Sequence, residues 1–186
     1  MTLKIAIDLD NTVFNTAIMV RDICVRNGVD FGILTSYDPY QCVPRHVADE
    51  IIAAFDSIEL HNMPVLNKKI PEILNQIMTR PDMEIYFITE RPIATIDMDI
   101  GQLNRAGIMC TRTQIVHCKP KIKALCNYGI RLCFDDSPNV VTDCVANNID
   151  IVMISNNDTP YNHQLRKHVK HCPDLVTALA RCGITK

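Results

Sequence analysis

Short apolar runs alternate with longer amphipathic stretches along this chain of 186 residues. Five of the apolar runs are typical of buried β-strands: residues 3–8, 83–88, 114–117, 131–135 and 149–154. Helical patterns lie between and after them: residues 67–79, 93–106, 120–128, 137–147 and 173–181. This alternation predicts an α/β fold with a Rossmann-like parallel sheet that is covered by helices on both faces.

Prolines and glycines agree with these helix boundaries. Pro71, Pro120 and Pro138 stand near predicted helix starts, where proline is tolerated because the first helical amides have no partner within the helix. Gly107 and Gly129 follow predicted helices, as C-terminal capping glycines do.

One interval departs from this alternation of predicted strands and helices. Residues 9–66 separate the first predicted strand from the helix at 67–79, which is far longer than an ordinary strand–helix connection. Helical patterns occur near 14–27 and 43–57, with an irregular stretch between them. We therefore predict a small helical cap over residues 14–66, and an α/β core formed by residues 1–13 and 67–186.

Composition narrows the classes of function. The hydrophobic fraction of 47% suffices for one full core and a smaller appendage. The net charge is −2, and the sequence contains no basic arm. We therefore expect neither a nucleic-acid partner nor a polybasic membrane contact. No apolar stretch approaches the roughly 20 residues of a membrane span, and we expect no leader before the first strand. We expect a soluble cytoplasmic protein and leave homodimer formation open.

The chain contains nine cysteines, and none of them forms a Cys-x-x-Cys pair. Several, such as Cys133 and Cys144, fall inside apolar runs. The odd number and the scattered spacing favour buried, reduced thiols over a disulfide framework.

Chemically active side chains stand at the carboxyl ends of four predicted strands: Asp8 and Asp10, Thr89, Lys119 and Lys121, and Asp135 and Asp136. The carboxyl ends of parallel strands meet at one edge of a sheet, so these side chains are expected to converge. Several carboxylates without a cation would repel one another. Mg²⁺ resolves this conflict, because it suits a few carboxylates together with water and a substrate phosphate. Metal, nucleophile, proton shuttle and cationic clamp together form the inventory of a phosphoryl-transfer site.

The carboxylates can take distinct roles. Asp8, at the end of its strand, can attack phosphorus and form an aspartyl-phosphate. Asp10 can protonate the leaving oxygen and later deprotonate the attacking water. The predicted ligands of Mg²⁺ are Asp8, Asp10, Asp135 and Asp136.

The phosphate itself needs hydrogen-bond donors. Backbone N–H groups of Asn11 and Thr12 can supply them, as they do in the concave amide clusters of anion-binding loops. The hydroxyl of Thr89 and a lysine complete the predicted phosphate site.

These motifs give the chain a resemblance to the haloacid dehalogenase superfamily of aspartate-dependent phosphatases. The Asp-x-Asp-x-Thr motif lies at residues 8–12, the strand-end threonine at Thr89, and the Asp-Asp motif at residues 135–136. The order and spacing are similar across nearly the whole chain. The resemblance implies a Mg²⁺-dependent phosphatase whose predicted cap at 14–66 is of the C1 type.

A narrower resemblance is to the 5'(3')-deoxyribonucleotidase-like branch. It is carried by three segments: Phe-Ile-Thr-Glu-Arg-Pro at 87–92, Phe-Asp-Asp-Ser-Pro at 134–138 and Asp-Thr-Pro-Tyr-Asn at 158–162. It implies a small phosphorylated substrate, a nucleoside 5'- or 3'-monophosphate, with base and sugar recognised by the cap. Glu90 departs from the pattern, because small residues are usual after the strand-end threonine. An acid so close to the phosphate would alter the choice of substrate.

The lysine that contacts phosphate is one of two. The resemblance favours Lys121, which opens the helix before the Asp-Asp strand at a similar spacing. Lys119 remains an alternative, because it lies immediately before Pro120, which is itself a candidate helix start.

Simpler interpretations exist for single residues. The segment 8–12 could be a capped turn, Thr89 a helix N-cap, and Arg91 a structural ion-pair residue rather than a catalytic one. The cap aromatics Tyr37 and Tyr40 favour local packing over base stacking.

Two alternatives to a nucleotidase remain open. One is a phosphatase of the same chemistry for a sugar phosphate, a nucleic-acid 3'-phosphate or a phosphoprotein. The other is a non-catalytic binding protein that has kept the fold.

Overall fold

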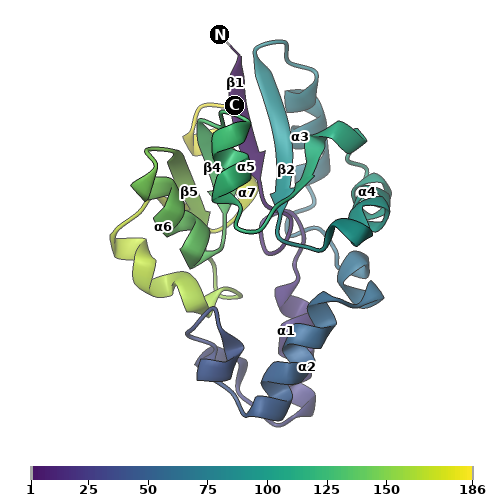
Figure 1. Ribbon diagram of the computed structural model, residues 1–186, viewed down its shortest axis with the longest axis vertical. Coiled ribbons are helices and arrows are strands. Elements are labelled where there is room, and N and C mark those ends of the chain that lie inside the picture. Colours follow the sequence, from purple (N-terminus) through teal and green to yellow (C-terminus); the bar gives the residue numbers. More distant parts are fainter. Residues whose placement is uncertain (1, 186) are drawn as a thin grey trace.

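The computed structural model of the protein describes residues 2–185. In this range, six parallel strands form one sheet in the order β3-β2-β1-β4-β5-β6 (Figure 1). The strands are β1 (Leu3–Ile7), β2 (Met83–Thr89), β3 (Ile115–His117), β4 (Leu132–Asp135), β5 (Asp150–Ile154) and β6 (His171–Cys172). The predicted α/β Rossmann-like fold is confirmed, and five of the strands lie where the apolar runs placed them.

Helices cover both faces of the sheet. One face carries α3 (Ile70–Met78), α4 (Ile96–Arg105) and α7 (Leu175–Arg181), which pack with Ile5 and Ile7 of β1. The other carries α5 (Ile122–Asn127) and α6 (Pro138–Ala146), which pack with Ala6 of the same strand. The alternation of Ile5, Ala6 and Ile7 between two cores follows from the two-residue period of a strand.

The register of β1 determines where the chemistry lies. Ile7 pairs with Phe87 of β2 on one side and with Phe134 of β4 on the other. The amide of Asp8 donates to the carbonyl of Phe134 over 3.0 Å. Asp8 is therefore level with the end of β4, where Asp135 stands.

The structure also differs from the sequence prediction in small ways. β6 was not predicted, because a strand of two residues leaves no periodic pattern. The pattern at 93–106 divides into a 3₁₀ turn, η4 (Ile93–Thr95), followed by α4. Gly107 and Gly129 have φ values of 84° and 66°, which agrees with the predicted capping role because glycine adopts this conformation without steric cost.

Residues 14–66, which we call the cap segment, project from the carboxyl edge of the sheet (Figure 1). The helices α1 (Ala17–Arg26) and α2 (Arg45–Phe55) pack against each other around an apolar core of their own. Three 3₁₀ turns accompany them: η1 (Phe31–Ile33), η2 (Pro39–Gln41) and η3 (Ile58–Asn62). A further 3₁₀ segment, η6 (Pro160–Lys167), lies between β5 and β6 in the chain.

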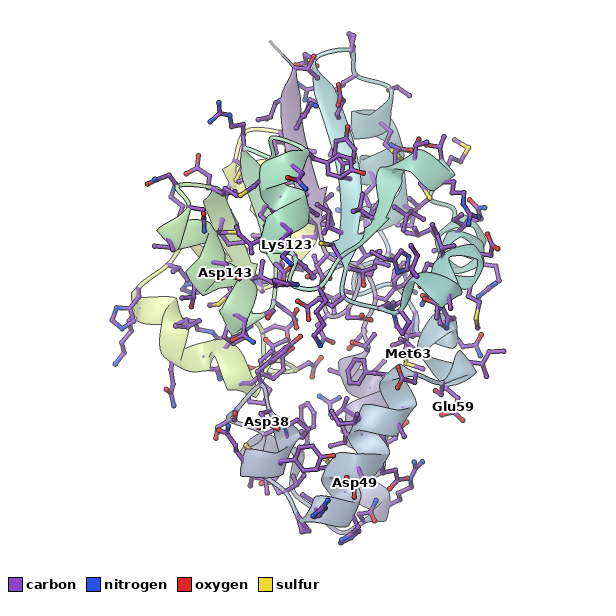
Figure 2. The ribbon with its side chains drawn as sticks, in the orientation of Figure 1. Asp38, Asp49, Glu59, Met63, Lys123 and Asp143 are labelled. Atoms are coloured by element: carbon purple, nitrogen blue, oxygen red, sulfur yellow. The ribbon has the colours of Figure 1, made fainter. Side chains whose placement is uncertain are left out.

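The cap segment is joined to the sheet by two chain crossings. Phe14 forms bridges with Asp10 and Val65, and the amide of Leu66 donates to the carbonyl of Val13 over 2.8 Å. Met63 lies at this junction, whereas Asp49 lies far from the sheet (Figure 2). The two crossings therefore pair with each other beside the loop that follows β1.

All nine cysteines are free thiols, and Cys24, Cys133, Cys144 and Cys172 are buried. The sequence favoured free thiols over disulfide bonds, and the cysteines have this form in the structure. Of the helices in residues 2–185, none has the length and apolar character to cross a membrane.

The helices on the sheet should contribute strongly to stability. Leu74 of α3 is 0% exposed in the larger core, so Leu74→Ala is expected to lower the free energy of unfolding by about 2–5 kcal/mol. Val145→Ala on α6, where the side chain is 58% exposed, should change it by less than about 0.5 kcal/mol. Urea unfolding curves of the two variants check this, and equal losses would contradict the assigned core.

Candidate active site

A tight loop carries Asp8 and Asp10 out of the sheet. Asn11 has a φ of 53°, a left-handed conformation that asparagine tolerates better than most residues. Its Oδ1 accepts hydrogen bonds from the Thr16 hydroxyl (2.9 Å) and the Ala17 amide (2.8 Å). The Asn11 side chain therefore fixes the loop to the start of α1.

Asp8 is buried and paired with Lys121. The Lys121 ammonium lies 2.5 Å from Asp8 Oδ1 and 2.7 Å from Asp135 Oδ2. Asp135 Oδ1 accepts from the amide of Ser137 over 2.9 Å. One lysine thus bridges the carboxylates that end β1 and β4, and both oxygens of Asp135 are engaged.

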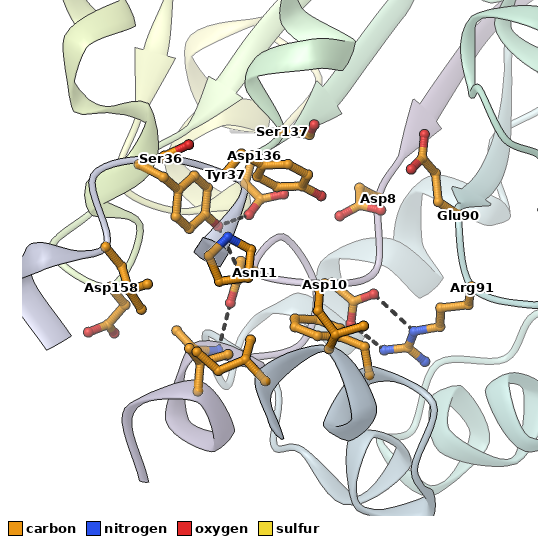
Figure 3. Close-up of a pocket in the computed structure, with 18 of the residues that line it drawn as sticks. Asp8, Asp10, Asn11, Ser36, Tyr37, Glu90, Arg91, Asp136, Ser137 and Asp158 are labelled. Atoms are coloured by element: carbon orange, nitrogen blue, oxygen red, sulfur yellow. Dashed lines mark hydrogen bonds and ion pairs between the residues drawn. The ribbon is translucent and has the colours of Figure 1, made fainter. Parts of the chain in front are cut away.

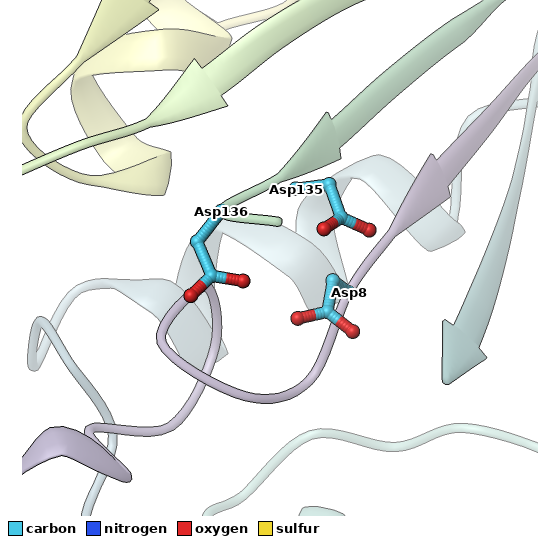
Figure 4. A group of neighbouring side chains, drawn as sticks. All are labelled: Asp8, Asp135 and Asp136. Atoms are coloured by element: carbon cyan, nitrogen blue, oxygen red, sulfur yellow. The ribbon is translucent and has the colours of Figure 1, made fainter. Parts of the chain in front are cut away.

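Asp8, Asp135 and Asp136 each offer a carboxylate oxygen, and these oxygens lie within 4.8 Å of one another (Figure 4). All three side chains are buried, so their mutual repulsion is weakly screened. Carboxylate oxygens are the ligands that Mg²⁺ prefers. The cluster therefore fits a divalent cation, because Lys121 alone does not balance three carboxylates.

The pKa values of the side chains in this cluster are shifted in the directions that an excess of negative charge produces. Burial, with further contributions from Asp135 and Asp136, raises the pKa of Asp8 well above its usual range despite the opposing effect of Lys121. Burial and the neighbouring Asp135 raise the pKa of Asp136 to about 7. Burial alone would lower the pKa of Lys121, but Asp135 and Asp8 outweigh it and raise that pKa, so the lysine stays charged.

Asp136 has a second set of contacts on the side of the cavity. The Tyr161 hydroxyl donates to Asp136 Oδ2 and accepts from Asn11 Nδ2 over 3.0 Å. Burial and the adjacent Asp136 raise the pKa of Tyr161 well above its usual range, so the phenol keeps the proton that it donates. The Tyr37 ring of the cap segment packs edge-on against Tyr161, with centroids 5.4 Å apart.

Asp10 is held by a different cation. Arg91 donates from Nε to Asp10 Oδ2 (3.0 Å) and from Nη2 to Asp10 Oδ1 (2.6 Å), which is the bidentate geometry of a strong ion pair (Figure 3). The Asp10 carboxylate is consequently directed at Arg91 and lies outside the cluster of three acids.

A cavity of about 530 Å³ lies between this edge of the sheet and the cap segment. Its floor includes Asp8, Asp10, Lys121 and Asp136. Its walls on the cap side are largely apolar: Val20, Phe31, Leu34, Tyr37, Pro39, Ile51, Ile52 and Phe55. The volume falls within the range of about 300–1,000 Å³ that is usual for small-molecule sites.

Neither a protein-family model nor a curated protein sequence matches the chain. Solved structures do match over nearly the whole length of both chains. A haloacid dehalogenase-like family hydrolase from Streptococcus pneumoniae has a TM-score of 0.64 at 13% identity, over 97% of this chain and 98% of that chain. A conserved haloacid dehalogenase-like protein of unknown function from Agrobacterium tumefaciens has a TM-score of 0.65 at 8% identity, over 100% of each chain.

A third match is a haloacid dehalogenase-family hydrolase from Deinococcus radiodurans with bound phosphate and sodium. Its TM-score is 0.61 at 12% identity, over 100% of this chain and 98% of that chain. The chain has the haloacid dehalogenase-like fold. At these identities the likeness establishes the fold alone.

Within this haloacid dehalogenase-like fold, the structure gathers most of the predicted site residues. Asp8, Lys121, Asp135 and Asp136 meet at the carboxyl edge. Of the two candidate lysines, Lys121 is buried in the cluster. Lys119 is exposed at the cavity and pairs with Glu90 over 3.7 Å.

The two threonines are placed differently. Thr12 and Thr89 are buried, and neither belongs to the lining of the cavity within residues 2–185. Thr89 ends β2 and its hydroxyl accepts from the amide of Arg91 over 3.2 Å, so it is not a helix N-cap. The Thr12 hydroxyl has no hydrogen-bond partner among the described residues.

Sequence reasoning gave no role to Tyr161 and treated Arg91 only as an ion-pair residue. Tyr161 lies inside the segment 158–162 that carries part of the resemblance, which is the signal that could have drawn attention to it. Nothing local in the sequence indicates that Arg91 pairs with Asp10, because 81 positions separate them.

The pKa of Asp136 predicts how Mg²⁺ binding depends on pH. The folded pKa of about 7 lies above the usual 3.8, so this group's contribution to stability is full at low pH and is lost as the pH rises through 7. A cation at the site requires the ionised carboxylate. Mg²⁺ affinity is therefore expected to fall by about tenfold per pH unit below 7, and more steeply where Asp8, whose pKa is also raised, takes up a proton as well.

Calorimetric titration with Mg²⁺ at pH 5.5, 6.5 and 8 checks this expectation. Asp136→Asn should bind weakly at every pH, whereas Asp97→Asn, on an exposed pair with Arg112, should behave like the wild type. An affinity that does not change between pH 5.5 and 8 would contradict it.

The two lysines should differ sharply. Lys121→Met leaves Asp8 and Asp135 without their cation, and we expect it to lower the free energy of unfolding by about 3–5 kcal/mol without Mg²⁺. Lys119→Met removes only an exposed pair and should cost less than about 1 kcal/mol. Denaturant unfolding in chelator measures both. Similar losses in the two variants would argue against the central position of Lys121.

Proposed function

We propose that this protein is a Mg²⁺-dependent phosphomonoesterase that acts on nucleoside monophosphates through an aspartyl-phosphate. One observation carries the proposal: two buried carboxylates, Asp8 and Asp136, and Lys121 lie on the floor of a cavity whose opposite walls are apolar and aromatic, and Asp135 completes the acidic cluster beside them. In this proposal residues 14–66 act as the cap, and residues 1–13 and 67–186 form the catalytic core.

Asp8 is the proposed nucleophile. Lys121 holds its Oδ1, which leaves the other oxygen to attack phosphorus. A bond forms between Asp8 and phosphorus while the ester P–O bond breaks. Asp10, which is protonated at this step, gives its proton to the departing oxygen and becomes the carboxylate that pairs with Arg91. A water molecule then attacks the phosphorus of the aspartyl-phosphate, gives its proton to Asp10, and releases inorganic phosphate and free Asp8.

Mg²⁺ fits the carboxylate cluster and would be held by Asp8 and Asp136, with Asp135 beside them. When bound, it supplies positive charge that offsets the phosphoryl oxygens and the acids. Asp136 is better placed than Asp135, because both oxygens of Asp135 are already engaged by Lys121 and the Ser137 amide. Asp10 was also predicted as a ligand of Mg²⁺, but its carboxylate is paired with Arg91. We therefore do not propose it as a ligand and keep only its predicted role in proton transfer.

The phosphate donors are Lys121 and the loop after β1. The backbone amides of Asn11 and Thr12 have no acceptor among residues 2–185, which is consistent with their predicted role. Thr89 was also predicted to contact the phosphate, but its hydroxyl accepts from the Arg91 amide and lies outside the cavity lining within residues 2–185, so we do not count it among the proposed donors. The Deinococcus radiodurans hydrolase of the same fold holds phosphate, which supports a phosphorylated substrate here.

The walls of the cavity favour a nucleoside over a sugar as the leaving group. Phe31, Tyr37 and Phe55 offer aromatic surface to a planar base. A bare sugar phosphate would instead need several polar groups to satisfy its hydroxyls. Glu90 and Lys119 flank the phosphate end of the cavity, where they can discriminate between phosphate esters.

A phosphate-release screen tests the function. Wild-type protein with Mg²⁺ is expected to hydrolyse ribo- and deoxyribonucleoside 5'- and 3'-monophosphates faster than sugar phosphates, a phosphopeptide or a 3'-phosphorylated oligonucleotide. Activity should disappear in chelator. Asp8→Asn should lower kcat on the order of 10³-fold or more, because it removes the nucleophile.

Asp97→Asn is the matched control, since it changes an exposed aspartate and should keep full activity. Turnover confined to sugar phosphates would overturn the substrate assignment while leaving the chemistry intact. The absence of turnover on every ester, despite bound Mg²⁺, would favour a binding protein.

A further inference from the structure

Asp99 of α4 is 0% exposed, and the proposed chemistry gives it no role. It lies behind Arg91, on the side away from Asp10. We propose that Asp99 is a positioning residue that sets the orientation of the Asp10 carboxylate through Arg91. This inference rests on the proposed role of Asp10 in proton transfer.

Arg91 has a defined partner for each nitrogen of its guanidinium. Nε and Nη2 engage the two oxygens of Asp10, and Nη1 donates to Asp99 Oδ1 (2.5 Å) and Gln102 Oε1 (2.9 Å). A planar guanidinium has a fixed fork, so contacts at one end determine the direction of the other. Asp99 and Gln102 thereby fix the edge that Arg91 presents to Asp10.

The burial of Asp99 is expensive, and neutralising Asp10 does not require it. Arg91 alone would balance the charge of Asp10, whereas a second buried carboxylate adds a desolvation cost. Asp99 Oδ2 also accepts from the Thr95 hydroxyl over 3.0 Å. What Asp99 adds is a geometric constraint on Arg91, which is the property that a proton-transfer group needs.

Two histidines whose side chains are buried complete the surroundings of Asp99. His61 Nε2 lies 3.1 Å from Oδ1 and His117 Nε2 lies 3.3 Å from Oδ2, while His117 Nδ1 lies 2.9 Å from the Arg91 carbonyl oxygen. Burial and the nearby Arg91 lower the pKa of His61, so its imidazole is neutral near pH 7. Of these three groups Arg91 lies closest to the Asp99 carboxylate, with Nη1 2.5 Å from Oδ1.

The same network reaches the cap segment. Gln102 Nε2 donates to the carbonyls of Leu60 and Met63, both over 3.2 Å, and Arg105 Nη2 donates to the carbonyl of His61 over 3.0 Å. These three acceptors belong to the chain that returns from the cap segment to the sheet. The orientation of Arg91 is thus tied to the position of this crossing.

The test separates proton transfer from a general loss of structure. A nucleoside 5'-monophosphate releases an alcohol, which needs a proton from Asp10, whereas p-nitrophenyl phosphate releases a stable phenolate that needs it much less. In Asp99→Asn, kcat/KM for thymidine 5'-monophosphate is expected to fall about 10–100-fold, and that for p-nitrophenyl phosphate less than about threefold. β-Glycerol phosphate replaces the nucleotide if the wild type does not use it.

Asp97→Asn is the control on the same helix. Its side chain is exposed and pairs with Arg112 rather than with the buried network, so both substrates should be unaffected. Arg91→Lys is the second variant, because it keeps the positive charge and loses the fork. It is expected to show the same selective loss of the alkyl ester, and it serves as the readout should Asp99→Asn fail to fold.

Equal losses on both substrates in a folded Asp99→Asn variant, or no loss on either, would overturn the proposal. Should the wild type hydrolyse neither ester, the proposed function fails, and the geometry is then tested by a crystal structure of Asp99→Asn. Displaced Arg91 and Asp10 side chains would support the positioning role. Side chains that keep their bidentate pairing in the original orientation would overturn it.

Discussion

The structure depends on a cluster of buried carboxylates at the carboxyl edge of the sheet. Asp8, Asp135 and Asp136 have one lysine among them, and burial leaves little solvent to screen their repulsion. Such an arrangement persists only if the backbone holds the three residues in place. The parallel register between β1 and β4 does so, because it sets Asp8 and Asp135 side by side and the core on both faces makes a slip costly.

The neighbouring acids 135 and 136 are made different by their contacts rather than by their sequence. Both carboxylate oxygens of Asp135 accept hydrogen bonds, one from Lys121 and one from the Ser137 amide, and so Asp135 orients the lysine. Asp136 faces the cavity and receives the Tyr161 hydroxyl. Asp136, whose pKa is about 7, is thus the one of these two acids that is open to a ligand. This separation of environments is what allows adjacent carboxyl groups to take separate roles.

The sequence predicted those parts of the molecule that depend on local pattern. Apolar runs located five strands, and the rule that parallel strands end at one edge predicted that Asp8, Lys121 and Asp135 lie together. The preference for Lys121 over Lys119 followed from the resemblance, and burial now separates the two residues. The pairing of Arg91 with Asp10 and the contact of Tyr161 with Asp136 could not be predicted. Both join residues far apart in the chain, and such contacts leave no periodic signal in a single sequence.

These long-range contacts give the cap segment two connections to the proposed chemistry. On one side, Tyr37 packs on Tyr161 and Arg21 pairs with Asp158, close to Asp136. On the other, the crossing at Leu60 to Met63 contacts Gln102, which shares Arg91 with Asp99 and Asp10. A displacement of the cap segment would therefore disturb the surroundings of the proposed metal ligand and of the proposed proton-transfer group together. Because the same segment supplies the apolar walls of the cavity, the fit of a leaving group there is coupled to the geometry of both acids.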